Sequence, residues 1–168
     1  MHFEVAHDFP AARARVVDLL SDPDFQTGLD LPDLSRPEVV DHEVDGTARV
    51  LRLRYEYVGQ LDPVARKLLS GRRLTWIQEL RLDTATFEGT LSFSAEADPG
   101  RLNGAASVVI DGDGSGARMD GGGARSQRRI AGDLHVRVPV VGGTAERRIV
   151  PGLVRRLDVE AAALTKAL

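Results

Sequence analysis

The C-terminal stretch of the chain decides how the rest must fold, and it reads TAERRIVPGLVRRLDVEAAALTKAL from Thr144 to Leu168. Its apolar residues recur every three or four positions and so fall on one face of an α-helix. They are Ile149, Leu153, Leu157, Ala161, Leu164 and Leu168. Thr144 has the side chain of an N-cap, and Pro151 predicts either a kink or a regular helix that begins near it. The pattern predicts a long amphipathic helix whose apolar stripe must be covered by the rest of the chain.

The central part of the chain alternates apolar and polar residues in the manner of β-strands. Turn residues such as Gly, Pro and Asp separate the alternating segments. We predict strands at residues 2–6, 40–44, 47–58, 72–84, 87–96, 102–110 and 127–138. Because most consecutive strands are joined by short connections, they should form an antiparallel meander.

Short helices are predicted at three further places. The first spans residues 12–20, and the second begins with Asp22 as its N-cap and Pro23 at its first position. The third spans residues 62–71, where an Asp-Pro pair opens the segment and a Gly ends it. Residues 1–168 are therefore predicted to form a single α+β domain. A curved antiparallel sheet of about seven strands wraps around the C-terminal helix, with two short helices after the first strand and one between the third and fourth.

A single helix is too narrow to fill the concave side of so wide a sheet, so we expect a cavity between them. The candidate ligand-binding residues are those on the inward strand faces together with two from the helix. They are Leu51, Leu53, Tyr55, Tyr57, Leu74, Trp76, Gln78, Leu91, Phe93, Leu153 and Leu157. Simple core packing explains the aliphatic members equally well, whereas a buried Gln78 needs hydrogen-bond partners and would suit a group that orients a ligand. Residues 64–69, with Phe25 and Leu29, could cap one mouth of the cavity.

The composition excludes several classes of function. The chain has no cysteine, which excludes disulfides and thiol chemistry, and no apolar run approaches the roughly 20 residues of a membrane span. A net charge of −3 argues against nucleic acid as the main partner. Four arginine pairs are interpreted as scattered, solvated charge. They are Arg72/Arg73, Arg128/Arg129, Arg147/Arg148 and Arg155/Arg156. A cytoplasmic location is the default expectation.

Metal binding and nucleophilic catalysis find little support in the sequence. Residues 111–116 resemble the first half of a calcium loop, but the position that needs a bidentate glutamate is Gly122. No two histidines stand at the spacing of a helical ligand pair, and no G-x-S-x-G motif surrounds a serine. We therefore expect no metal, no cofactor and no catalytic nucleophile.

Two alternatives to ligand binding stay open. In an enzyme of the cyclase or hydratase type, Tyr55, Tyr57 or His42 would polarise a carbonyl of a hydrophobic substrate, and His42 shares a strand face with Val40 and Val44. In an interaction module, an exposed sheet edge or helix would dock another protein.

The order of elements resembles the helix-grip fold of the START, Bet v 1 and polyketide cyclase superfamily (SRPBCC). Within it, the chain is similar to a mainly actinobacterial group known as domain of unknown function 2505. Three segments carry this resemblance: Phe3-Glu-Val with Phe9-Pro-Ala, residues 62–69, and residues 136–143 leading to Glu146. The resemblance implies a pocket for a hydrophobic small molecule or lipid, and it transfers no catalytic residue.

Overall fold

The computed structural model describes residues 1–60, 73–112, 124–137 and 142–168, and these form one sheet with helices on its concave side. The strands are β1 (His2–Phe9), β2 (Glu38–Asp45), β3 (Ala48–Tyr57), β4 (Leu74–Asp83), β5 (Glu88–Ala95), β6 (Leu102–Gly112) and β7 (Ser126–Val136). The helices are α1 (Arg13–Leu20), α2 (Pro23–Thr27) and α4 (Gly142–Ala167). The predicted α+β class and the seven-stranded antiparallel sheet are confirmed, while the predicted helix at 62–71 lies outside the described residues.

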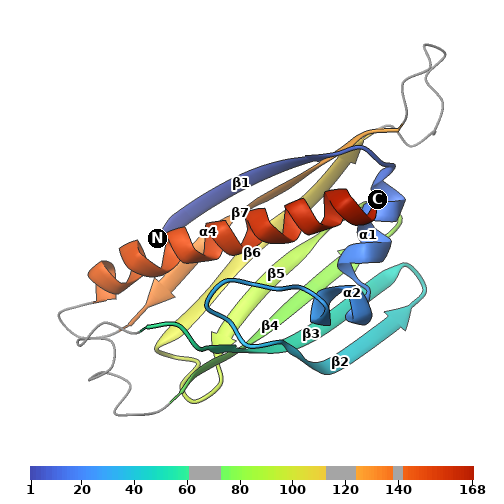
Figure 1. Cartoon of the computed structure of the whole chain (residues 1–168). Helices are drawn as coiled ribbons and strands as arrows, with labels where there is room; N and C mark the ends of the chain where they lie inside the picture. Colours follow the sequence, from blue (N-terminus) through green and yellow to red (C-terminus); the bar gives the residue numbers. More distant parts are fainter. Residues whose placement is uncertain (61–72, 113–123, 138–141) are drawn as a thin grey trace.

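The strand order is β1-β7-β6-β5-β4-β3-β2, and every neighbouring pair is antiparallel. The meander runs from β2 to β7, and the first strand then pairs with the last. Figure 1 shows α4 lying across this sheet, and α1 and α2 lie near the C-terminal end of α4. No helix among the described residues is long and apolar enough to cross a membrane.

The two faces of the sheet differ as the alternation predicts. On β3, the side chains of Leu51, Leu53 and Tyr55 are buried against the helices. Between them, Arg52 pairs with Asp41 of β2 and Glu79 of β4 on the outer face. These partly exposed ion pairs contribute little individually, so the burial of the inner face is the main stabilising term.

Helix α4 buries the predicted stripe but differs from the prediction at its start. Leu157, Ala161 and Leu164 are buried, and Ile149, Leu153 and Leu168 pack against the same core while remaining partly exposed. The helix begins at Gly142, so the prediction of Thr144 as N-cap is wrong. It also runs without interruption through Pro151, which rules out a regular helix that begins there. Near its start, the carboxylate of Glu146 accepts a hydrogen bond of 2.8 Å from the backbone N–H of Val136, which ties α4 to the end of β7.

Gly132 of β7 lies in close contact with the backbone of β6. A Cβ atom added at Gly132 would lie 2.2 Å from the carbonyl oxygen of Ala105 and 2.5 Å from the Cβ of Ala106. A Cβ at Gly152 of α4 would meet nothing within 4 Å. Packing therefore requires a glycine at position 132, where no side chain fits, but not at position 152.

We expect Gly132→Ala to destabilise the fold by about 1–3 kcal/mol, because the neighbouring backbone must shift. Gly152→Ala should instead raise the free energy of unfolding by up to about 1 kcal/mol, because alanine is the better helix former. Urea unfolding of both variants beside the wild type measures this. Equal stability of Gly132→Ala and the wild type would contradict the close approach.

Candidate functional site

A cavity of about 440 Å³ lies between the first half of α4 and the end of the sheet at which β3 ends and β4 begins. This volume falls within the range of roughly 300–1,000 Å³ that is typical of small-molecule sites. The sheet contributes Tyr57, Leu74, Trp76, Phe93, Ser94, Leu102 and Leu134. The helix contributes Ile149, Pro151, Gly152, Leu153, Arg155 and Arg156, and the loops contribute Pro32, Asp33, Leu34 and Gln60.

The structure divides the candidate residues of the sequence analysis into two groups. Tyr57, Leu74, Trp76, Phe93 and Leu153 line the cavity. Leu51, Leu53, Tyr55, Gln78, Leu91 and Leu157 are buried in the core and are not part of its lining. The second group belongs to the middle of the strands and of α4, where helix and sheet pack directly against each other. Phe25 and Leu29 also pack in this core region and do not line the cavity; residues 64–69, predicted to cap it with them, lie outside the described residues.

The cavity wall is apolar and aromatic because of the way Phe93 and Trp76 are placed. Phe93 stands opposite Gly104 of β6, and its ring occupies the space of the missing side chain, since an added Cβ would lie 2.1 Å from the ring. Trp76 stacks on Tyr55 with ring centroids 5.5 Å apart and an interplanar angle of 14°. Trp76 itself stays partly exposed, so apolar surface remains at the cavity.

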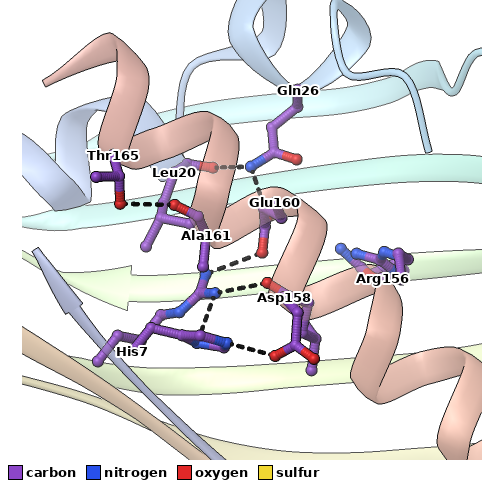
Figure 2. Close-up of polar contacts among 11 residues, drawn as sticks. His7, Leu20, Gln26, Arg156, Asp158, Glu160, Ala161 and Thr165 are labelled. Carbon is purple, nitrogen blue, oxygen red and sulfur yellow. Dashed lines mark hydrogen bonds and ion pairs between the residues drawn. The ribbon is translucent and has the colours of Figure 1, made fainter.

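A buried polar cluster fixes α4 to the sheet beyond the cavity (Figure 2). Arg128 of β7 donates to Glu160 of α4 over 2.9 Å, and both side chains are almost fully buried. Gln26 of α2 donates to the other oxygen of Glu160 over 2.9 Å and to the carbonyl oxygen of Leu20 over 3.1 Å. Three elements that are distant in sequence thus meet at one carboxylate.

His7 and Asp158 extend this cluster to the surface. Arg128 lies 3.2 Å from Nδ1 of His7, and Nε2 of His7 lies 2.9 Å from the carboxylate of Asp158. Because a guanidinium can only donate, Nδ1 of His7 accepts the hydrogen bond from Arg128. Nε2 then carries the ring hydrogen and donates it to the carboxylate of Asp158. His7 therefore links β1 to α4 in one defined tautomer.

The charge state of Glu160 follows from two opposing effects. Burial raises the pKa of Glu160, but the charges of Arg128 and Arg156 and the hydrogen bonds from Gln26 and Arg128 together hold this pKa below its usual value. The carboxylate is ionised at neutral pH. The cluster thus contains a genuine ion pair and not a neutral hydrogen-bonded one.

Arg156 lies on α4 next to this cluster but has different partners. Its Nη1 donates to Oε1 of Gln78, and its guanidinium lies 4.6 Å from the ring centroid of Tyr55. The predicted need of a buried Gln78 for a partner is thus met by Arg156. Burial raises the pKa of the Tyr55 hydroxyl; Arg156 opposes this shift and Glu160 adds to it.

The interpretation of all four arginine pairs as solvated charge is wrong for Arg128 and Arg156, which are only 1% and 5% exposed. Arg128 has the same strand parity as Ile130 and Leu134, so the alternation itself pointed it inward. Arg156 borders the apolar stripe of α4 beside Leu157. These positional signals were available in the sequence, although the residue type argued against burial.

The strand face that His42 shares with Val40 and Val44 is exposed to solvent and is not part of the core. β2 is an edge strand, His42 is exposed, and Val40 and Val44 are 52% and 59% exposed. Of the three groups considered for carbonyl polarisation, only Tyr57 lines the cavity. Within the described ranges, no cluster of histidines and carboxylates could hold a metal ion, and most of the glycine-rich segment compared with a calcium loop lies outside them.

The chain has the helix-grip fold, in which an antiparallel sheet wraps around a long C-terminal helix. The chain belongs to the family described as "Protein of unknown function (DUF2505)", whose model matches residues 4–168. No curated protein matches the chain.

Solved structures share this fold at low sequence identity. A Thermus thermophilus protein, TTHA0849, has a TM-score of 0.62 and 16% identity, covering 99% of this chain and 95% of that one. The Zhui aromatase/cyclase from Streptomyces sp. R1128 has a TM-score of 0.51 and 18% identity, covering 99% and 90%. Ara h 8.0201 has a TM-score of 0.55 and 13% identity, covering 98% of each chain. At these identities the likeness shows the fold alone.

We expect Glu160→Gln to lower the free energy of unfolding at pH 7 by about 3–5 kcal/mol, because Arg128 would remain buried without its counter-charge. Asp158→Asn, at an exposed acid of the same cluster, should cost about 1 kcal/mol or less. Urea unfolding of the two variants measures the difference. An equal loss of stability in the two variants would contradict the role of Glu160 as the buried counter-charge of Arg128.

The pH dependence of the same variants provides a second test of this cluster. Since the pKa of Glu160 is lower in the folded than in the unfolded state, its stabilising effect is complete above the unfolded value of about 4.5 and is lost as the pH falls through the folded value. The difference in the free energy of unfolding between wild type and Glu160→Gln should therefore become smaller at acidic pH.

Tyr55 should resist ionisation in the folded protein. The chain has two tyrosines, so the variant Tyr57→Phe isolates Tyr55. Its ultraviolet tyrosinate signal at about pH 10, where a free tyrosine is half ionised, should be weaker than that of the unfolded chain, because burial raises the pKa of the Tyr55 hydroxyl. The same variant unfolded in urea is the control and should titrate normally. A half-ionised Tyr55 in the folded protein would show that its hydroxyl is not buried.

Proposed function

We propose that this protein binds one hydrophobic small molecule, such as a lipid or an aromatic metabolite, in the cavity between the sheet and α4, and releases it unchanged. The observation that carries the proposal is a cavity of about 440 Å³ whose wall is mostly apolar and includes Tyr57, Trp76 and Phe93. A ligand that covers apolar wall surface gains about 25 cal/mol for each Å² removed from water. The cytoplasm, expected from the sequence, is the proposed place of action.

The geometry of the wall supports binding of a ligand from solution. Leu74, Trp76, Ile149 and Leu153 line the cavity and are only partly buried, although the last three pack against the core. Their exposed parts face a cavity and not another element of the described structure. Apolar surface left uncovered in this way is what a hydrophobic ligand needs.

An enzyme of the cyclase type is the second candidate, and Tyr57 is the observation that favours it. Its phenol lines the cavity, and a structure of the same fold is an aromatase/cyclase. General acid or base catalysis needs a titratable group within reach of the substrate. The described lining offers Tyr57 and Asp33 for this purpose, whereas His42 and Tyr55 lie elsewhere. Binding without conversion requires fewer groups and ranks first.

Docking of another protein ranks third. The exposed apolar residues of the edge strand β2 are Val39, Val40 and Val44, which the charged neighbours Asp41 and Glu43 interrupt. Charges along an edge strand are a common protection against pairing with other chains. This strand therefore gives weaker support to a function than the cavity does.

The neutral dye Nile red tests the proposal. Its fluorescence should rise saturably with the wild-type protein, and Gly152→Trp should weaken dye binding at least about tenfold by filling the cavity. The control Ala162→Trp places the same side chain at an exposed position on α4 that does not line the cavity. Native mass spectrometry of gently purified protein would detect a copurifying ligand. Absence of both dye uptake and ligand, or equal binding by the two tryptophan variants, would overturn the proposal.

A further inference from the structure

Charges buried beside the cavity do not balance. Arg128 and Arg156 are buried cations, and Glu160 is the only fully buried carboxylate that faces them among the described residues. The two carboxylate oxygens of Glu160 accept hydrogen bonds from Arg128 and Gln26. The two buried cations thus share one buried carboxylate, and only Arg128 forms a direct ion pair with it.

Arg156 interacts with the charge of Glu160 through space, but its direct contacts are one hydrogen bond and one ring contact, and it forms no ion pair in the described structure. Gln78 accepts one hydrogen bond, and the ring of Tyr55 lies beneath the guanidinium. Nε of Arg156 is buried and has no hydrogen-bond partner in the described structure. In Figure 2, Arg156 lies apart from the contacts that join His7, Asp158 and Glu160. A guanidinium has five N–H donors, so most of its capacity is left for another group.

Arg156 also lines the cavity, and the other charges of the lining add no buried counter-ion. Arg155 contributes a second positive charge at an exposed position, and Asp33 contributes one negative charge from an exposed loop. The sheet side of the described lining carries no acidic residue. An apolar cavity with a buried cation in its wall is thus complementary to a molecule with an apolar body and one anionic end.

We propose that the ligand of this cavity is an amphipathic acid whose anionic oxygen atoms pair with Arg156. This inference rests on the proposed binding function and adds the chemical class of the ligand. A carboxylate would supply both the missing acceptors and the missing charge, whereas an alcohol or amide would supply only acceptors. Gln78 and Tyr55 act as positioning residues, because they hold the guanidinium at the cavity wall.

Matched probes separate the charge of the ligand from its apolar body. Dodecanoate is compared with dodecanol, and 2-naphthoate with 2-naphthalenemethanol, by displacement of Nile red at pH 8. The wild type should bind the acid of at least one pair about tenfold or more tightly than its alcohol. The pair that shows this preference distinguishes a fatty acid from an aromatic acid as the source of the anionic group.

Variants locate the preference at Arg156. Arg156→Met keeps an unbranched chain without the charge and should reduce the acid-to-alcohol preference to about one, while alcohol binding stays within about threefold of wild type. Arg156→Lys should retain part of the preference. Arg129→Gln removes an exposed charge on β7 that does not line the cavity and should leave the preference unchanged.

A measurement on the wild type alone keeps the inference testable if a variant fails to fold. Carbon-13 NMR of dodecanoate or naphthoate labelled at the carboxyl carbon should show that the bound acid stays ionised at least one pH unit below the free acid. A bound acid that titrates at or above its free value, equal binding of acid and alcohol, or a preference kept by Arg156→Met overturns the inference. Failure of every probe and of Nile red to bind the wild type would instead overturn the proposed function.

Discussion

The ion pair between Arg128 of β7 and Glu160 of α4 sets the position of the C-terminal helix, and the rest of the structure follows from that position. Both groups are buried, so neither charge could remain there without the other. Gln26 adds α2 to the same carboxylate, and His7 connects β1 to the same arginine. An apolar stripe alone would let a helix slide along or rotate on a sheet, whereas this cluster specifies one register.

In this position of α4, its two halves have different surroundings. The second half, with Leu157, Ala161 and Leu164, packs on the sheet and closes the core. The first half passes over the end of the sheet where Tyr57 and Leu74 lie, and it leaves the cavity beneath it. Arg156 stands at the boundary between the halves, which is why a buried cation meets an apolar space. One helix cannot fill the concave face of seven strands, and the unfilled part is the candidate site.

The fold by itself assigns no chemistry. The likeness to an aromatase/cyclase and to Ara h 8.0201 extends over nearly the whole chain, but identity below 20% leaves the side chains of the site free to differ. The chemistry of this site therefore depends on the residues of its own lining. That lining offers aromatic surface, the phenol of Tyr57, the carboxylate of Asp33 and the guanidinium groups of Arg155 and Arg156.

Sequence periodicity was sufficient to predict the strands, the amphipathic C-terminal helix and the fold class, because alternation and helical spacing are local properties of the chain. It also identified Trp76, Phe93 and Leu153, which the structure places at the cavity. It could not separate these from Leu51, Leu53 or Leu91, since inward-facing residues look alike whether a helix or an empty space lies opposite them. Only the tertiary structure decided that difference, together with the burial of Arg128 and Arg156. A charged side chain becomes tolerable inside a protein through partners distant in sequence, and no local pattern records where those partners will lie.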